Sequence, residues 1–167
     1  MAKWGEGDER WIVAERNDGT NINGWHWTEK SIMTWCKDRL ESLCAGIQPA
    51  APEDNISASI VGIKELTGEA SVTTRKGNKK FAVYDLTVVL KWQGRVVSPS
   101  ATEDAVEGTI KVTELAEGND ADDYTFAVTV EGKGKAQDTL KRAMATTKKA
   151  VYEKLEEFVE QMKREHC

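Results

Sequence analysis

The sequence predicts an α+β domain: an N-terminal helix, an antiparallel meander sheet of about four strands, and a long C-terminal helix packed along the sheet. Two apolar patterns lead to this class. Between residues 82 and 92 every second residue is apolar, the period of a strand with one buried face. Near the C-terminus apolar residues recur at helical spacing and form one stripe. An apolar sheet face gives such a helix the long surface that it needs.

Length and composition fit one domain. The chain has 167 residues, of which 40% are hydrophobic, so it can bury one core. A net charge of −5 argues against a general nucleic-acid or anionic-membrane binder, whose footprint is usually basic. The sequence lacks a long apolar run and the apolar core of a signal peptide. We therefore expect a soluble, cytoplasmic protein with an N-terminal arm at 1–27 and a single α+β domain at 28–167.

The first predicted helix runs from Thr28 to about Ala45. Thr28 is a suitable N-cap, the apolar residues that follow approximate one face, and Gly46 ends the helix. The next segment, 48–54, contains two prolines and indicates a connector.

Strand-like segments follow the connector. Residues 56–66 are rich in β-branched side chains, and their alternation shifts in a way that suggests a bulge at Gly62. We expect a break at Thr67–Gly68, and then a hairpin made of 69–76 and 79–92. In the second hairpin strand the even-numbered residues from Ala82 to Trp92 form a core-facing stripe.

The second half of the chain predicts two more strands and a helix. A loop at 93–104 precedes a strand at about 105–114, and an acidic turn at 117–123 leads to a strand at 124–130. The apolar stripe then predicts one helix of about 28 residues, roughly 42 Å long. The stripe consists of Leu140, Met144, Thr147, Val151, Leu155, Phe158 and Met162.

Candidates for catalysis or metal binding are few. The chain has two histidines, His26 and His166, and no nucleophile or phosphate-binding motif. No Cys-x-x-Cys pair occurs among the three cysteines. Cys36 and Cys44 would lie about 12 Å apart on one helix, which is beyond disulfide reach. We expect reduced thiols, no metal site, no cofactor and no catalytic residue.

Four cations gather at the predicted hairpin tip of an otherwise acidic chain. A two-residue loop, Gly77–Asn78, would place Arg75 opposite Lys80 and Lys76 opposite Lys79. Like charges facing each other across a hairpin are destabilising. The arrangement favours an acidic partner, although lysines also protect exposed hairpin tips from aggregation.

The segment Asn21-Ile22-Asn23-Gly24-Trp25-His26-Trp27 places two tryptophans around a histidine. So aromatic a segment is costly to leave in water, so it either packs on the domain or serves as a docking element. In an extended chain Trp25 and Trp27 face the same side, which suits a hot spot for another protein.

Two other functions fit parts of the sequence. A single-stranded nucleic-acid binding module would stack bases on Trp25 and Trp27 beside the basic hairpin, but the net charge of −5 counts against it. A carrier of lipid or another small ligand would enclose its cargo between the sheet and the long helix, and an empty apolar cavity would favour it.

Residues 21–27 resemble the Asn-x-Asn-Asn-Trp-His-Trp motif of the activators of the heat-shock protein 90 ATPase. Three further stretches are similar to that family: 1–8, 10–13, and the approach from 68–71 to the basic residues at 75–77. The resemblance runs from the first residue to the final helix and so covers the whole chain.

The resemblance implies a co-chaperone of protein folding and the stress response, with no catalytic residue of its own and monomeric when free. Its partner would be the heat-shock protein 90 dimer, bound at the middle segment with contact to the N-terminal nucleotide domain, and its effect would be ATPase stimulation. By position, Arg75 and Lys76 match the family's basic pair. Lys79 or Lys80 supplies the next cation, and Glu69 matches an acidic contact residue. The residues implicated in full stimulation are Asn21, Asn23, Trp25, His26 and Trp27.

The chain departs from the family pattern at three points. Gly24 stands where the motif has its third asparagine, so a looser turn is expected there. The basic turn reads Arg-Lys-Gly-Asn-Lys-Lys rather than Arg-Lys-Gly-Lys, so the tip should be longer by about one residue. Family members also carry a second domain, whereas this chain stops at Cys167. We therefore expect either an excised N-terminal domain or a short single-domain homologue.

Overall fold

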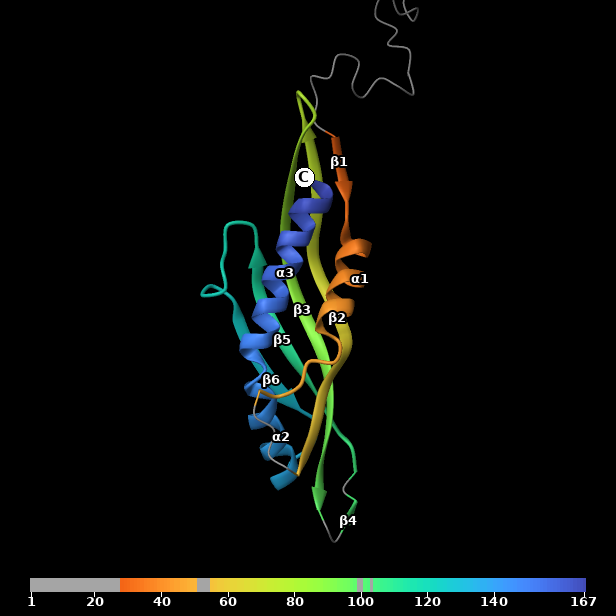
Figure 1. Cartoon of the computed structure of the whole chain (residues 1–167), viewed down its shortest axis with the longest axis vertical. Helices are drawn as coiled ribbons and strands as arrows, with labels where there is room; N and C mark the ends of the chain where they lie inside the picture. Colours follow the sequence, from red (N-terminus) through yellow and green to blue (C-terminus); the bar gives the residue numbers. More distant parts are fainter. Residues whose placement is uncertain (1–27, 51–54, 99–100, 103) are drawn as a thin grey trace, which may run out of the picture.

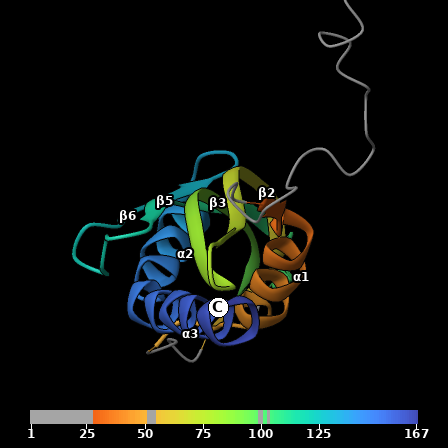
Figure 2. The ribbon, with the colours of Figure 1, turned by 90° about the horizontal axis from the view of Figure 1, so that it is seen from above.

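An antiparallel sheet with its helices on one face forms the fold (Figures 1 and 2). The computed structural model describes residues 28–50, 55–98, 101–102 and 104–167. The strand order is β1-β2-β3-β5-β6, with β4 paired to β3 outside this path. The predicted α+β class is confirmed, with more strands than the four expected. The elements are β1 (Thr28–Ser31), α1 (Met33–Cys44), β2 (Ile56–Arg75), β3 (Lys79–Ser98), β4 (Ala101–Thr102), β5 (Val106–Ala116), β6 (Thr125–Val130), α2 (Lys135–Ala145) and α3 (Lys148–His166).

The core lies between the sheet and the helices, where both predicted apolar patterns meet. Every even-numbered residue from Ala82 to Trp92 is buried, and so is the whole helical stripe from Leu140 to Met162. The Trp92 indole donates a hydrogen bond of 3.2 Å to the carbonyl of Thr129, so its polar atom is satisfied inside the core. Each large side chain buried here contributes about 1.5–3 kcal/mol to folding.

The predicted single C-terminal helix is two helices, which is a correction to the sequence prediction. The chain turns at Thr146 and Thr147, between α2 and α3. Each threonine hydroxyl donates a hydrogen bond of 2.6 Å to a carbonyl three residues earlier, that of Ala143 or Met144. Such hydroxyl bonds compete with the helical backbone bonds and interrupt the helix. The apolar stripe continues across the interruption, which is why its spacing predicted one helix.

The predicted start of the first helix at Thr28 is also wrong. Residues 28–31 form β1, an edge strand that pairs with residues 71–74 of β2. Between β1 and α1, the amide of Ile32 donates a hydrogen bond of 2.9 Å to the carbonyl of Ala70, which fixes this junction to β2. Pairing with a distant strand decides the conformation here, whereas the sequence shows only local preference. The predicted end of the helix is right within two residues, since α1 ends at Cys44.

The predicted break at Thr67–Gly68 does not exist. β2 is one continuous strand of 20 residues that runs through this point. Gly68 has a φ of +109°, and a Cβ at that position would lie 2.0 Å from the carbonyl oxygen of Asp85. Only glycine allows β2 and β3 to approach so closely at this row. The expected irregularity near Gly62 is present as a register shift between Ile60 and Gly62.

The β2–β3 hairpin is the longest feature of the fold. Residues 93–98, predicted as part of a loop, extend β3 to Ser98. At about 3.3 Å per residue, each 20-residue strand spans roughly 66 Å. The hairpin tip therefore projects beyond the end of α3, where the C-terminus lies (Figure 1).

Candidate functional site

The basic tip of the β2–β3 hairpin closes differently from the sequence prediction. A three-residue turn, 76–78, replaces the expected two-residue loop, and the left-handed φ angles of +82° and +57° fall on Gly77 and Asn78. Arg75 consequently pairs with Lys79, and Thr74 with Lys80. The predicted cross-strand pairs are wrong by one residue, but two cations still face each other at the last row of the ladder.

An apolar patch follows the basic tip on the outer face of the sheet. Phe81 pairs with Thr73, and Val83 pairs with Ser71 two residues further on. Their exposures of 44% and 48% are high for large apolar side chains in strands. The Arg75 guanidinium lies 5.3 Å from the centre of the Phe81 ring, a cation–π distance that joins the basic tip to the patch.

Carboxylates follow the apolar patch. Glu69 pairs directly with Asp85, so two exposed carboxylates stand opposite each other on β2 and β3. At the edge of the same face, Glu29 of β1 accepts a hydrogen bond of 2.6 Å from the Ser71 hydroxyl. Like charges directly opposite destabilise a sheet, so neither the cationic row nor the acidic row is explained by folding alone.

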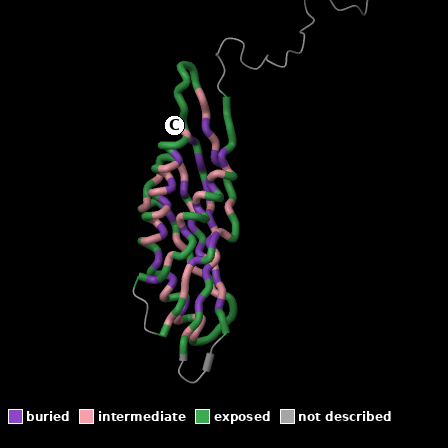
Figure 3. Tube along the Cα trace, turned by 45° about the vertical axis from the view of Figure 1, so that its right-hand side comes forward, coloured by how far each residue is buried: buried purple, intermediate pink, exposed green. Residues whose placement is uncertain are grey.

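We call these residues the outer-face site: Glu69, Arg75, Lys79, Phe81, Val83 and Asp85. Pairs in the antiparallel ladder share a face, so the site presents cations, then apolar groups, then carboxylates. Six residues of strand between Arg75 and Glu69 span about 20 Å. The helices lie on the opposite side of the sheet (Figure 2), and the exposed residues of the tip are visible in Figure 3. Such a surface can bind another protein of complementary charge order.

Of the sequence-predicted contact residues, the structure brings Glu69, Arg75 and Lys79 onto one face. Lys80 pairs with Thr74 on the other face, where it is exposed because the helices do not reach the tip. Lys76 lies in the turn itself. Phe81, Val83 and Asp85 were not selected from the sequence. The alternation of residues 82–92 could have found them, because it sends the odd-numbered neighbours outward.

The predicted activation motif lies outside the described residues: Asn21, Asn23, Trp25, His26 and Trp27. Its connection to the fold is nevertheless defined. Thr28, the next residue, pairs with Thr74, one row from Arg75. The arm therefore joins the domain beside the basic tip.

The described part of the chain offers no catalytic or metal-binding constellation. Cys36 and Cys44 are free and buried, and burial raises the pKa of each thiol to about 12, so neither is a nucleophile near neutral pH. His166 packs edge-on against Trp35, with ring centres 4.7 Å apart. Among the described residues, no group of three or more His, Cys, Asp or Glu side chains could hold a metal ion. None of the described helices is long and apolar enough to cross a membrane.

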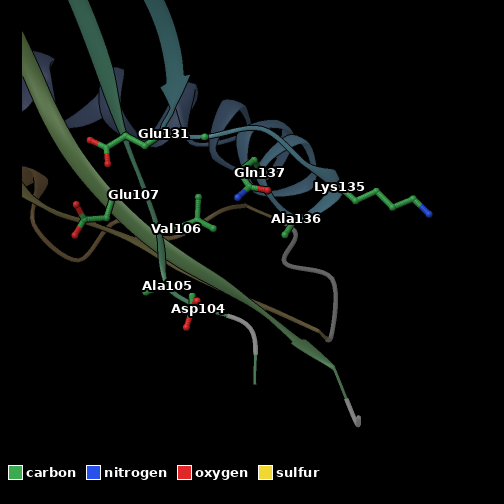
Figure 4. A pocket seen from close by; sticks show the side chains of 9 residues that line it. Asp104, Ala105, Val106, Glu107, Glu131, Lys135, Ala136 and Gln137 are labelled. Carbon is green, nitrogen blue, oxygen red and sulfur yellow. The ribbon is translucent and has the colours of Figure 1, made fainter. Parts of the chain in front are cut away.

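Surface hollows give little support to a carrier of small ligands. The space between sheet and helices is filled by fully buried side chains such as Trp92 and Phe158. A hollow of about 910 Å³ is open and lies at the far end from the basic tip. Figure 4 shows the carboxylates of Asp104, Glu107 and Glu131 around it, while Lys135 extends away.

The fold is an antiparallel sheet with its helices on one face and a charged, partly apolar surface on the other. The family model for "Activator of Hsp90 ATPase, N-terminal" matches residues 29–166. The chain belongs to this family.

Relatives and a solved structure agree with that assignment. The chain is 40% identical over 166 residues to the activator of 90 kDa heat shock protein ATPase homolog 2 of Bos taurus, covering 99% of this chain and 61% of the relative. The Mus musculus homolog 2 is 39% identical over 166 residues, with coverages of 99% and 48%. This chain thus spans about half to three-fifths of these relatives, which are named as activators of an ATPase.

The fold matches the crystal structure of Aha-1 from Plasmodium falciparum with a TM-score of 0.62 at 12% identity, covering 81% of this chain and 88% of that one. At this identity the match supports the fold alone.

Proposed function

We propose that this chain is a co-chaperone that binds the middle segment of the heat-shock protein 90 dimer and stimulates its ATPase. One observation supports the docking role most directly. In a member of the activator family, the outer-face site combines facing cations, an exposed apolar patch and facing carboxylates. The facing like charges lower the stability of the sheet, and the apolar patch is unfavourable in contact with water. A complementary partner would relieve both effects.

In this proposal the basic tip docks on an acidic surface of the chaperone, and the arm acts after docking. The motif at 21–27 would contact the N-terminal nucleotide domain and favour its ATP-hydrolysing arrangement. Each tenfold rise in ATPase rate requires about 1.4 kcal/mol more affinity for the competent state than for the resting state. Binding that is equally tight to the resting and the competent state would not raise the ATPase rate.

The proposal includes the division into an arm at 1–27 and an α+β domain at 28–167, a monomer when free, and a cytoplasmic location. Free thiols at Cys36, Cys44 and Cys167 fit a reducing compartment. The single-stranded nucleic-acid alternative gains no support from the relatives, which are named as activators of an ATPase.

Isothermal titration of the chaperone's middle segment with this chain tests the docking claim. The double substitution Arg75→Glu with Lys79→Glu keeps like charges facing each other at the tip, so the repulsion across the hairpin is kept and only the contact of Arg75 with the Phe81 ring is lost. We expect at least a tenfold loss of affinity, or about 1.4 kcal/mol, and a loss that shrinks as salt is added.

The matched control is Lys133→Glu with Lys135→Glu, which makes the same change of net charge on exposed residues at the far end of the fold. It should bind like the original chain. Equal weakening by both double variants would show that only net charge matters and would refute docking by the tip.

A further inference from the structure

In the described part of the chain, β6 forms an edge of the sheet whose outward backbone groups pair with no other strand. The amide of Glu131 donates a hydrogen bond of 2.8 Å to the carbonyl of Glu107 on β5. In an antiparallel ladder, successive residues alternate between bonding the neighbour and pointing away. The backbone groups of Phe126, Val128 and Val130 therefore point outward from β5. In the described sheet β6 pairs with no other strand.

This edge lacks the protection that sheet edges usually carry. Residues 125–130 read Thr-Phe-Ala-Val-Thr-Val, with no charge, proline or glycine. The opposite edge strand, β1, reads Thr-Glu-Lys-Ser. Charges, prolines and bulges are the devices that keep edge strands from pairing with other chains, and a neutral segment of high β-propensity invites pairing.

A groove accompanies the open edge on the helix side. The side chains of Phe126 and Val128 form its apolar floor, and α2 forms its wall with Lys141 and Arg142, in a hollow of about 510 Å³. We call it the β6 groove; its lining also includes Asp138 and Ala145. Within the described part of the chain, Lys141 and Arg142 have no salt bridge or side-chain hydrogen bond. Two cations against one carboxylate give the groove a positive balance.

We propose that the β6 groove binds an extended acidic segment of another protein chain by β-strand addition. The added strand would bond to the outward backbone groups of β6, which supplies affinity without sequence preference. Its alternate side chains would enter the groove, apolar ones over Phe126 and Val128, and carboxylates beside Lys141 and Arg142.

A second copy of this chain fits the groove less well. Pairing β6 with β6 of another copy would place two α2 helices on the same side of the joined sheet. Their Lys141 and Arg142 side chains would then meet cations of the same kind. An acidic strand meets no such repulsion. This inference stands apart from the proposed function, because the outer-face site lies on the other face of the sheet.

Nuclear magnetic resonance titration of the ¹⁵N-labelled full chain tests the inference. The probe is the peptide acetyl-Thr-Glu-Thr-Val-Thr-Glu-Thr-amide, whose Glu-Val-Glu side would face the groove, and the comparison peptide has Lys for Glu. We expect the amide signals of Phe126, Val128 and Val130 to shift with saturation at about millimolar peptide. The lysine peptide should bind about fivefold more weakly or worse.

Charge exchange provides the control for folding. Lys141→Glu with Arg142→Glu should reverse the preference, so that the lysine peptide binds better, a gain that a misfolded variant cannot show. Arg75→Glu with Lys79→Glu should leave peptide binding unchanged. Equal binding of both peptides, shifts located elsewhere, or no shift would overturn the inference. Shifts of β6 signals with protein concentration alone would identify a second copy as the occupant and would overturn it as well.

Discussion

At the residue scale, the alternation of β3 explains why large apolar side chains are exposed. Even-numbered residues such as Tyr84 face the helices, and the odd-numbered Phe81 and Val83 must then face outward. A sheet covered on one side usually carries polar groups on the other. Phe81 departs from that pattern beside Arg75, whose guanidinium lies over its ring. An aromatic ring beside a cation is the composition of an interface hot spot.

We predict that Phe81→Ala weakens binding to the chaperone's middle segment by about 1–2 kcal/mol, through lost apolar contact. This loss of affinity should be nearly independent of salt concentration, whereas the loss caused by Arg75→Glu with Lys79→Glu should shrink as salt is added. Because 44% of the side chain is exposed, the thermal midpoint should change little. Val97→Ala, an exposed position at the other end of β3, is the control. Binding titrations at two salt concentrations check this, and unchanged affinity for the Phe81 variant would exclude the apolar patch from the interface.

At the element scale, the long hairpin depends on a glycine that holds two strands close together. We predict that Gly68→Ala lowers the free energy of unfolding by about 2 kcal/mol or more, through a left-handed φ and a clash with the backbone of Asp85. Gly77→Ala shares the positive φ but has open space around its Cβ, so it should cost about 1 kcal/mol. Urea denaturation measures both, and equal losses would show that the close approach at Gly68 has no energetic weight.

The sequence predicted those elements whose pattern is local. Alternation identified the buried face of β3, and the three-and-four spacing identified the stripe from Leu140 to Met162. It did not reveal the interruption at Thr146–Thr147, because a hydroxyl that bonds to a backbone carbonyl leaves the apolar period unchanged. β1 was missed because its conformation comes from pairing with residues forty or more positions away.

The candidate site was predicted only in part, because some of its features depend on pairing between strands and not on local pattern. Arg75 and Lys79 could be selected by residue type, and Glu69 only through the family resemblance. The pairing across the tip depended on a turn of three residues instead of two. Alternation could have placed Asp85 on the outer face, but only the register of the ladder shows that it stands opposite Glu69. Sequence alone gives no such register.

At the scale of the whole molecule, the two proposed binding surfaces are separate. The outer-face site occupies the uncovered face of β2 and β3, and the β6 groove lies on the helix side at the other edge of the sheet. The chain carries a net charge of −5, yet four cations gather at 75–80. This uneven distribution would orient the protein as it approaches an acidic partner, and added salt would weaken the effect.

The most direct test of the proposed function is the ATP turnover of the full-length chaperone with and without this chain. We predict that the chain raises turnover, and that Arg75→Glu with Lys79→Glu abolishes the rise at concentrations where the original chain saturates. Asn23→Ala with Trp25→Ala should keep binding but reduce the maximal rise, because the arm is proposed to act after docking. Unchanged turnover with saturating, bound chain would contradict the account.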